Sequence, residues 1–347
     1  MTTARKELVD VALTRWYHCI SHCVRSALLM GHGTDDRKQW IEDRLEHLTQ
    51  SFAIGVGGFA VMDSHLHVVC RLDPNESRNW LPEEIMRRWI AVYPPRNLAL
   101  DSPKAVNTWI TQQVKDTHRV EVLRQRLSNL GWFMKALKEP LARIANKADC
   151  CRGTFWSARY KSIAILDDEA LLATSIYVDL NPLAAGIAET PENSNHTSIK
   201  QRVEHARDQG EMARLAAAEQ GSFAGISAAG NAEQGHWLIP IEDRRRETVL
   251  TTESEREGMI ESFSLGSYLL LVDYTCRLYR NGKARLDSAA KGVFERLGIN
   301  QAWSCQVQIM LGCRSLRGNF FATNPVLVQR LAKNRGRRTV NLRPQVA

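Results

Sequence analysis

Residues 53–72, AIGVGGFAVMDSHLHVVCRL, contain the pattern that decides the fold. Two apolar runs rich in β-branched and aromatic residues lie on either side of Asp63-Ser64, a pair that favours a tight turn. The simplest interpretation is a β-hairpin, with one strand over 53–62 and a second over 65–72. The rest of the sheet is predicted by working outward from this hairpin.

The flanking sequence predicts four more elements of the same domain. They are, in chain order, a strand over 15–31, a helix over 35–52, a strand over 155–166 and a helix over 167–181. A polar segment from about 73 to 151 has a helical pattern, and its last helix supplies the second crossover between strands. The first six elements of this β-α-β-β-α-β-α order predict an α+β, ferredoxin-like βαββαβ fold, with one antiparallel sheet and helices on one face.

Three regions are expected along the chain. The first, residues 12–205, contains the strands and helices above, with a helical insertion at about 73–151. Residues 206–235 include a run rich in alanine, glycine and serine, which favours a linker. The remainder, residues 236–347, is a smaller C-terminal region of mixed pattern that ends in a basic tail and is a candidate for binding DNA.

The charge of the chain favours a polyanionic partner. The 347 residues carry a formal net charge of +8 at pH 7, which makes nucleic acid the first expectation. The eight cysteines show no C-x-x-C spacing and fit reduced thiols. No apolar run predicts a signal peptide or a membrane span, so we expect a cytoplasmic, nucleoid-associated protein.

Two histidine pairs lie on predicted strands. In the first strand, His18 and His22 face one side while the neighbouring cysteines face the other, which argues against a zinc site. In HLHVV, His65 and His67 share one face, about 7 Å apart along the backbone, and can converge on one divalent cation. A pair of ordinary core or surface histidines is the alternative interpretation of such an H-x-H pattern.

The predicted helix over 167–181 offers further donors for a site. Tyr177 and Asn181 are four residues apart and therefore share one face of a helix. An amide oxygen suits a hard cation, and imidazole accepts manganese among other ions. Packed over the face of the sheet that carries His65 and His67, this helix would complete a His-His-Asn site with a phenol beside it. Taken alone, a tyrosine near a helix end is more often a core residue.

Five stretches of the chain resemble a known family of enzymes. They are YHCISHCV, FAVMDSHLHVV, FWSARYKS, ILDDEALL and IYVDLNPLAAGIA. Together they resemble the single-tyrosine HUH transposases, in particular the REP-associated tyrosine transposases, which recognise repetitive extragenic palindromes in bacterial genomes. The histidine-hydrophobic-histidine strand and the Y-x-x-x-N-P end of the helix are the specific features. The resemblance covers residues 12 to 200, interrupted by the helical insertion.

The resemblance implies an activity and the residues that perform it. His65 and His67 match the family's metal ligands, Asn181 its third, polar ligand and Tyr177 its nucleophile. Members of the family cleave single-stranded DNA next to a folded hairpin with Mg²⁺ or Mn²⁺, form a 5′-phosphotyrosine and release a 3′-hydroxyl. The implied partner is single-stranded or hairpin DNA, repetitive extragenic palindromes included. No membrane partner is expected, and monomer and homodimer both stay open.

Basic and aromatic residues are candidates for contacting this DNA. Arg159 and Lys161 share one face of the strand predicted over 155–166, where phosphate contact and plain exposure are the two interpretations. Trp156 is suited to stacking on an extruded base, although a buried core tryptophan is an equally good interpretation. Three arginines of the basic tail are candidates for the duplex stem of a hairpin: Arg335, Arg337 and Arg338.

The chain departs from the family's pattern at three positions. Ala184 and His22 stand where arginine is usual, and Ser157 stands where an acidic residue is common. These differences bear on DNA affinity more than on chemistry, because they remove neither a proposed metal ligand nor the nucleophile. Asp63 in the hairpin turn is an additional candidate ligand, but a simple turn residue is the plainer interpretation.

Other functions fit parts of the pattern. A hairpin-DNA-binding protein that keeps the fold and the basic surface but has lost turnover is the main alternative. A rolling-circle initiator or relaxase uses the same histidine pair, but usually with a third histidine, for which this sequence has no suitably placed candidate. An RNA-binding module of ferredoxin-like shape would leave the shared histidine face unexplained.

Overall fold

The structure of the chain is a computed structural model. The structure describes residues 8–31, 35–213, 232–243, 257–261, 263–281, 307, 310–311, 319–324 and 326–327. The proposed DNA contacts Arg335, Arg337 and Arg338 lie outside the described residues, as does most of the predicted linker. Their predicted roles, like the predicted domain boundaries, stay predictions.

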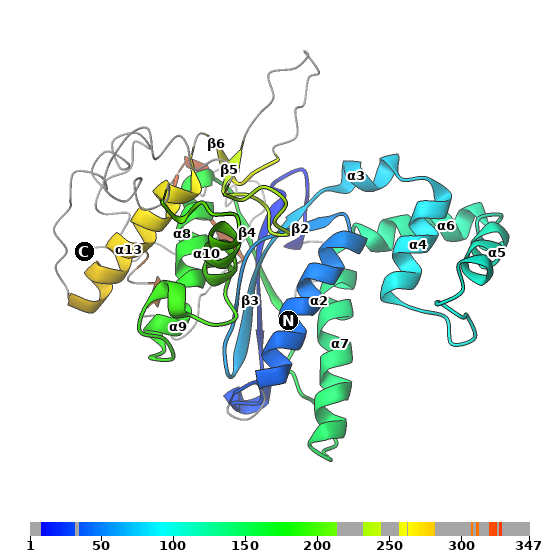
Figure 1. The fold of residues 1–347 in the computed structure, drawn as a ribbon, viewed down its shortest axis with the longest axis horizontal. Helices are drawn as coiled ribbons and strands as arrows, with labels where there is room; N and C mark the ends of the chain where they lie inside the picture. The colour runs from blue at the N-terminus through cyan, green and yellow to red at the C-terminus, as the bar shows by residue number, and fades with distance from the viewer. Residues whose placement is uncertain are drawn as a thin grey trace, which may run out of the picture.

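A five-stranded sheet forms the centre of the described structure, with strand order β2-β3-β1-β4-β7 (Figure 1). Its strands are β1 (Trp16–His22), β2 (Ile54–Val61), β3 (His65–Leu72), β4 (Lys161–Ile165) and the two-residue β7 (Phe320–Phe321). The first four pair antiparallel, and β7 joins β4 in parallel. The hairpin predicted over 53–72 is confirmed, and so is the α+β class.

Two helices cover the first face of the sheet. They are α2 (Asp35–Ser51) and α7 (Leu130–Ala148), which lie side by side (Figure 1). Leu45 of α2 and Leu137 of α7 are buried in one apolar cluster with Tyr17, Cys19 and Val68, side chains that alternate onto this face of β1 and β3. The helix predicted over 35–52 is therefore confirmed, and its apolar stripe packs on the sheet.

The helical insertion extends away from the sheet, to the right in Figure 1. Its helices before α7 are α3 (Pro74–Asn79), α4 (Pro82–Val92), α5 (Pro103–Gln113) and α6 (Thr117–Leu127). Trp89 and Tyr93 of α4 contact Trp132 at the start of α7, and the guanidinium carbon of Arg126 lies 4.5 Å from the centroid of the Trp132 ring. These aromatic and cation–π contacts attach the insertion to the helix that packs on the sheet.

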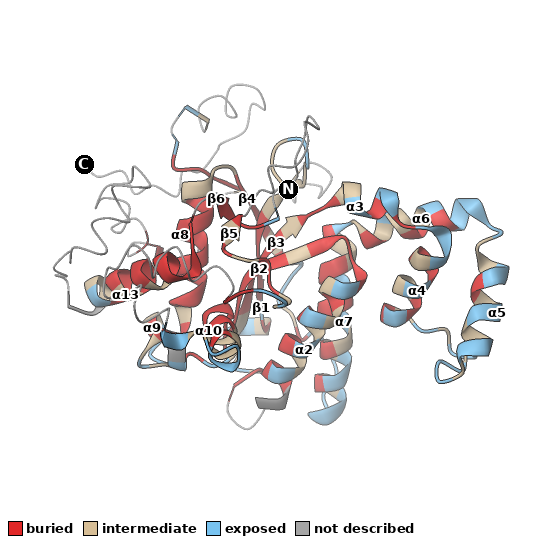
Figure 2. Cartoon of the chain, turned by 45° about the horizontal axis from the view of Figure 1, so that its top comes forward, coloured by how far each residue is buried: buried red, intermediate tan, exposed pale blue. Residues whose placement is uncertain are grey.

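A second helical layer covers the opposite face. It contains α8 (Asp168–Asp179), α10 (Ser198–Asp208) and α13 (Leu265–Asn281). Every residue of α8 from Ala170 to Asp179 is buried, as its colour in Figure 2 shows, because the sheet lies on one side of it and α10 and α13 on the other. Asp167 caps the helix by accepting a hydrogen bond from the backbone N–H of Ala170.

Short elements complete the described chain. They are the 3₁₀ turns Val24–Ser26 and Pro191–Asn193, the one-turn helix α9 (Asn181–Ala184), and the paired β5 (Glu242–Asp243) and β6 (Ile260–Glu261). No helix among the residues described is long and apolar enough to cross a membrane.

Two predicted strands are shorter than expected. The strand predicted over 15–31 ends at His22, because Arg25 and Ser26 adopt left-handed backbone conformations that a strand cannot continue through. The strand predicted over 155–166 begins only at Lys161. Before it, Trp156 forms a single bridge to Cys23, and the chain then bends, so these residues follow β1 without joining its ladder.

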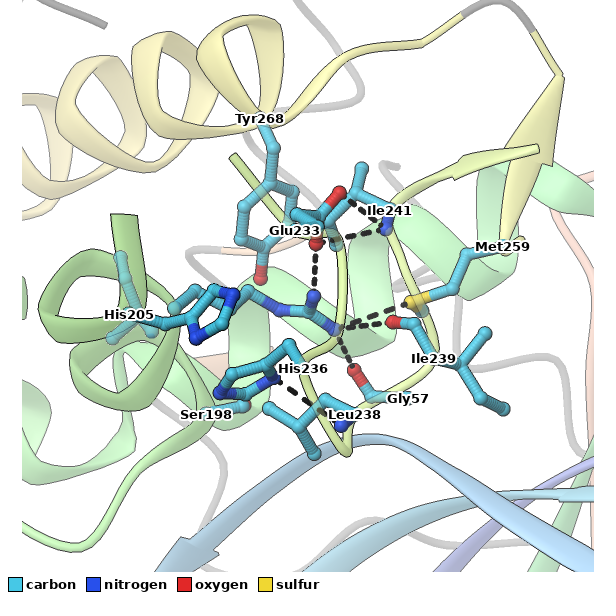
Figure 3. Close-up of polar contacts among 12 residues, drawn as sticks. Gly57, Ser198, His205, Glu233, His236, Leu238, Ile239, Ile241, Met259 and Tyr268 are labelled. Carbon is cyan, nitrogen blue, oxygen red and sulfur yellow. Dashed lines mark hydrogen bonds and ion pairs between the residues drawn. The ribbon is translucent and has the colours of Figure 1, made fainter. Parts of the chain in front are cut away.

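A buried ion pair holds the second helical layer against the edge of the sheet (Figure 3). The guanidinium of Arg202 in α10 is 1% exposed, pairs with the Glu233 carboxylate, and donates hydrogen bonds to the carbonyls of Gly57 at 2.9 Å and Ile239 at 2.7 Å. Burial raises the pKa of Glu233, whereas Arg202 and the backbone N–H of Ile241 oppose that rise. One side chain therefore joins α10, β2 and residues 232–243.

We predict that Arg202→Met lowers the free energy of unfolding by about 3–5 kcal/mol, because it leaves the Glu233 carboxylate buried without its counter-ion. Arg207→Met on the exposed side of the same helix is the matched control, with an expected change within about 0.5 kcal/mol. Urea unfolding of both variants measures the difference. Equal stability of the two variants would contradict a structural role for the ion pair.

Candidate functional site

Four histidines gather on the face of the sheet that α8 covers. His18 and His22 lie on β1, and His65 and His67 lie on the adjacent β3. In the register of the two strands His22 is directly opposite His65, and His67 is opposite Ile20. Because side chains alternate along a strand, this register places all four rings on one side.

The four rings contact one another in a continuous group. His18 Nε2 lies 2.9 Å from His67 Nδ1, within hydrogen-bonding distance. The His22 and His65 rings stack with their centroids 5.1 Å apart, and the rings of His65 and His67 meet edge to face at 4.9 Å. The predicted histidine pair is thus half of a larger cluster.

The protein environment keeps these histidines neutral. Burial lowers the pKa of His18 to about 3 and that of His65 to about 4, and it lowers the pKa of His67 well below its ordinary value. Lys161, at the start of β4 and opposite Ile20, adds a positive charge that lowers the pKa of His18 and His22 further. Neutral imidazole is the form that binds a metal ion.

Tyr177 lies against this cluster from α8. Its ring meets the rings of His18 and His67 edge to face, with centroid distances of 6.0 and 5.5 Å. The side chain is 6% exposed, because α8 is enclosed on all sides. The structure therefore brings Tyr177 to the histidine face, as the element order predicted.

Asn181 lies one turn beyond Tyr177, at the first residue of α9. Its side-chain N–H₂ donates to the Tyr177 carbonyl at 3.2 Å. The same side chain hydrogen-bonds His65 and so partly opposes the effect of burial on the pKa of that ring. His65, His67, Tyr177 and Asn181 are therefore neighbours, as the sequence predicted, while the roles assigned to them stay predictions.

One ring nitrogen of the predicted site, His67 Nε2, is available to a divalent cation. His67 Nε2 is buried and makes no hydrogen bond within the described chain, so it is a ring nitrogen without a partner. No set of three or more histidine, cysteine, aspartate or glutamate side chains among the described residues is arranged to hold a metal ion. A His-His-Asn set contains only two residues of those types, so His65, His67 and Asn181 still supply suitable donors.

Asp63 is engaged elsewhere. Its carboxylate pairs with Lys38 at 2.5 Å, and its backbone carbonyl accepts a hydrogen bond from Met30. Its charge raises the pKa of His65, although less than burial lowers it. The geometry supports the plainer interpretation of Asp63 as a turn residue.

The candidate DNA contacts are placed differently from one another. Lys161 is half-buried beside the histidines, and burial lowers its pKa. Arg159 is exposed in the bend before β4, so the prediction that it shares one face of a strand with Lys161 is wrong. Trp156 is half-buried, donates its indole N–H to the Lys138 carbonyl at 3.0 Å, and has the Lys138 ammonium 4.9 Å from its ring centroid.

Sequence reasoning missed His18 and His22 as members of the site. The sequence predicted that His18 and His22 share one face of a strand. It was not used to predict that this strand, β1, pairs with β3. The signal was available, because a βαββαβ order places the first strand next to the third. That order would have brought both histidine pairs together.

Comparison with known proteins yields one distant similarity. No family model and no curated protein matches this chain. A solved structure of a REP-associated tyrosine transposase bound to a REP hairpin matches at 11% sequence identity with a TM-score of 0.33. The match covers 55% of this chain and 78% of that one.

We predict that the histidine cluster makes the fold acid-sensitive. Between the ordinary histidine pKa of 6.5 and the folded values of about 3 for His18 and about 4 for His65, the unfolded chain binds more protons than the folded one. The contribution of these histidines to the free energy of unfolding is therefore complete above pH 6.5 and decreases as the pH drops through this window. For His18 the loss between pH 7.5 and 5.0 is about 2 kcal/mol.

Urea unfolding at these two pH values measures the loss. His18→Gln should lose part of the dependence, whereas His118→Gln, at an exposed position in α6, should keep it. Comparing variants separates the histidines from Asp179 and Glu233, whose raised pKa acts in the opposite direction. If wild type and His18→Gln lost the same stability on acidification, His18 would not be the cause.

Proposed function

We propose that this chain is a metal-dependent DNA endonuclease and strand transferase of the single-tyrosine HUH type, built on a ferredoxin-like core. The observation that carries the proposal is the packing of the Tyr177 ring against His67 and His18. Asn181, one turn beyond Tyr177, hydrogen-bonds His65. The packing of Tyr177 places a phenol beside neutral imidazoles that can hold a cation. A tyrosine nucleophile that acts on a metal-bound phosphate needs this arrangement.

His65, His67 and Asn181 are the residues that would hold Mg²⁺ or Mn²⁺. When bound, such an ion would polarise a non-bridging phosphate oxygen and align the scissile phosphate. The unpartnered Nε2 of His67 and the neutral state of both rings support this assignment. Imidazole suits manganese and the amide oxygen suits either ion.

Tyr177 would act as the nucleophile. Its phenol oxygen forms a bond to phosphorus while the bond from phosphorus to the 3′ oxygen breaks, which leaves a 5′-phosphotyrosine. The phenol proton passes to solvent, and the departing oxygen takes up a proton to become a 3′-hydroxyl. Because the phosphotyrosine retains the energy of the phosphodiester, a 3′-hydroxyl can later attack it and rejoin DNA without ATP.

The substrate class follows from charge and from the resemblance in sequence. A net charge of +8 favours nucleic acid. Lys161 places a positively charged ammonium group at the edge of the histidine cluster, where a phosphate of the DNA would enter. Arg159 and Trp156 lie on the approach to β4 and are the next candidates for contact. We propose single-stranded DNA beside a hairpin, such as a repetitive extragenic palindrome, as the substrate.

One observation favours a second function. The Tyr177 side chain is only 6% exposed, so a phosphate reaches it only if the covering segments move. A protein of the same fold that binds hairpin DNA but has lost turnover would show the same buried tyrosine. Binding and cleavage therefore have to be measured separately.

We predict that the wild-type protein forms a covalent adduct with single-stranded DNA carrying a hairpin, in Mn²⁺ or Mg²⁺ but not in chelator. Tyr177→Phe should abolish the adduct, because it removes the attacking oxygen. Tyr93→Phe is the matched control and should retain it, since Tyr93 lies in the helical insertion and its hydroxyl is buried without a hydrogen-bond partner. Denaturing electrophoresis of labelled DNA detects the adduct.

Hairpin binding is measured in parallel by fluorescence anisotropy. Retained binding with no adduct in any metal would support the binding protein and exclude the transferase. An adduct that persists in Tyr177→Phe would show that another residue is the nucleophile.

A further inference from the structure

The hydrogen bond between His18 and His67 has no part in the function proposed above. The two rings are 1% and 2% exposed, and His18 Nε2 lies 2.9 Å from His67 Nδ1. His18 comes from β1 and His67 from β3, where they are diagonal neighbours, since His18 is opposite Val69 and His67 is opposite Ile20. The contact therefore depends on the pairing of the two strands.

Two proton arrangements satisfy this hydrogen bond between neutral rings. In one, His67 Nδ1 carries the proton and donates it to His18 Nε2, so that His67 Nε2 keeps a lone pair. In the other, His18 Nε2 donates to His67 Nδ1, and His67 Nε2 then carries an N–H. Only the first arrangement leaves His67 with a nitrogen able to bind a cation, because a neutral imidazole has one bare nitrogen.

We propose that His18 is a positioning residue, which accepts a hydrogen bond from His67 Nδ1 and thereby presents His67 Nε2 as the cation-binding atom. The inference rests on the proposed function, in which His67 holds a divalent ion. Ligand histidines generally donate their second ring N–H to an outer partner, which fixes the tautomer and the orientation of the ring. The outer partner here is another imidazole rather than a carboxylate.

The burial of the unpartnered nitrogen supports this arrangement. His67 Nε2 has no hydrogen-bond partner in the described chain, so an N–H there would be buried without an acceptor. A bare lone pair at the same atom is equally unpartnered in the empty protein, but a cation satisfies it. In this arrangement, a bound cation gives His67 Nε2 the partner that it otherwise lacks.

His18 also contacts the proposed nucleophile. The Tyr177 ring meets His18 and His67 edge to face, so both rings of the hydrogen-bonded pair support one side of the tyrosine. Loss of His18 would therefore disturb two things, the orientation of His67 and the packing of Tyr177. The affinity for a metal ion, measured without DNA, reports on the orientation of His67 and does not depend on Tyr177.

His22, the other histidine of β1 in the cluster, lacks this hydrogen bond. It lies on the same face of β1 and stacks on His65 with a centroid distance of 5.1 Å. No hydrogen bond from its ring to His65 or His67 is seen in the structure. The two histidines of β1 therefore differ in the feature that the proposal invokes.

The experiment measures Mn²⁺ binding to the full-length protein by isothermal titration calorimetry. His18→Phe keeps a ring of similar size but has no acceptor, and we expect about 10–100-fold weaker binding. His18→Gln restores an acceptor oxygen and should recover most of the affinity. His118→Phe, at an exposed position in α6 away from the site, should bind as wild type does, and circular dichroism checks that each variant is folded.

A second measurement needs no variant of His18. In the metal-free wild type, ¹⁵N nuclear magnetic resonance of labelled histidine distinguishes the two tautomers of His67, whose signals are assigned by their loss in His67→Gln. We expect the proton on Nδ1. A proton on Nε2, or a His18→Phe protein that binds Mn²⁺ as tightly as wild type, would overturn the role of His18 alone. A wild type that binds no Mn²⁺ would overturn the proposed metal site and this inference with it.

Discussion

The antiparallel pairing of β1 with β3 is the interaction on which the candidate site depends. It brings His22 opposite His65 and places His18 within hydrogen-bonding distance of His67. Because side chains alternate along a strand, a slip of one residue in this register would move one histidine pair to the other face. Residues such as Cys19 and Val68, which now fill the first apolar core, would leave it. Packing on one face thus fixes the geometry on the other.

The second constraint is the enclosure of α8. A helix that is buried on all sides has its rotation and height set by its neighbours, so the place of Tyr177 follows from the packing of the whole layer. Asp179, two residues beyond it, accepts hydrogen bonds from Ser198 of α10 and Tyr268 of α13, both at 2.5 Å. These bonds and the Arg202–Glu233 pair tie residues 198–281, where described, to the helix of the candidate nucleophile. The same enclosure leaves Tyr177 little exposed.

Much of the fold could be predicted from local pattern. The turn at Asp63-Ser64 and the helix over 35–52 each depend on a few neighbouring residues, and each was placed correctly. The errors fall where the chain leaves the sheet. Residues 155–160 have the composition of a strand, but Trp156 alone among them forms a bridge, to Cys23. The chain bends after Trp156 and leaves the neighbouring backbone. Composition shows that a segment suits a strand, but the ladder also needs a neighbouring backbone in register.

The sequence by itself determined which side chains share a face, since that depends only on the period of a strand or a helix. His65 with His67, His18 with His22, and Tyr177 with Asn181 are pairs of this kind. Only the tertiary structure decided that the three pairs meet, that Lys161 lies beside them in β4 while Arg159 is exposed before that strand, and that His67 hydrogen-bonds His18. These contacts join residues between 43 and 159 positions apart, counted from His22 to His65 and from His18 to Tyr177, and no local period reaches so far. They exist because strand pairing and helix burial bring distant segments together.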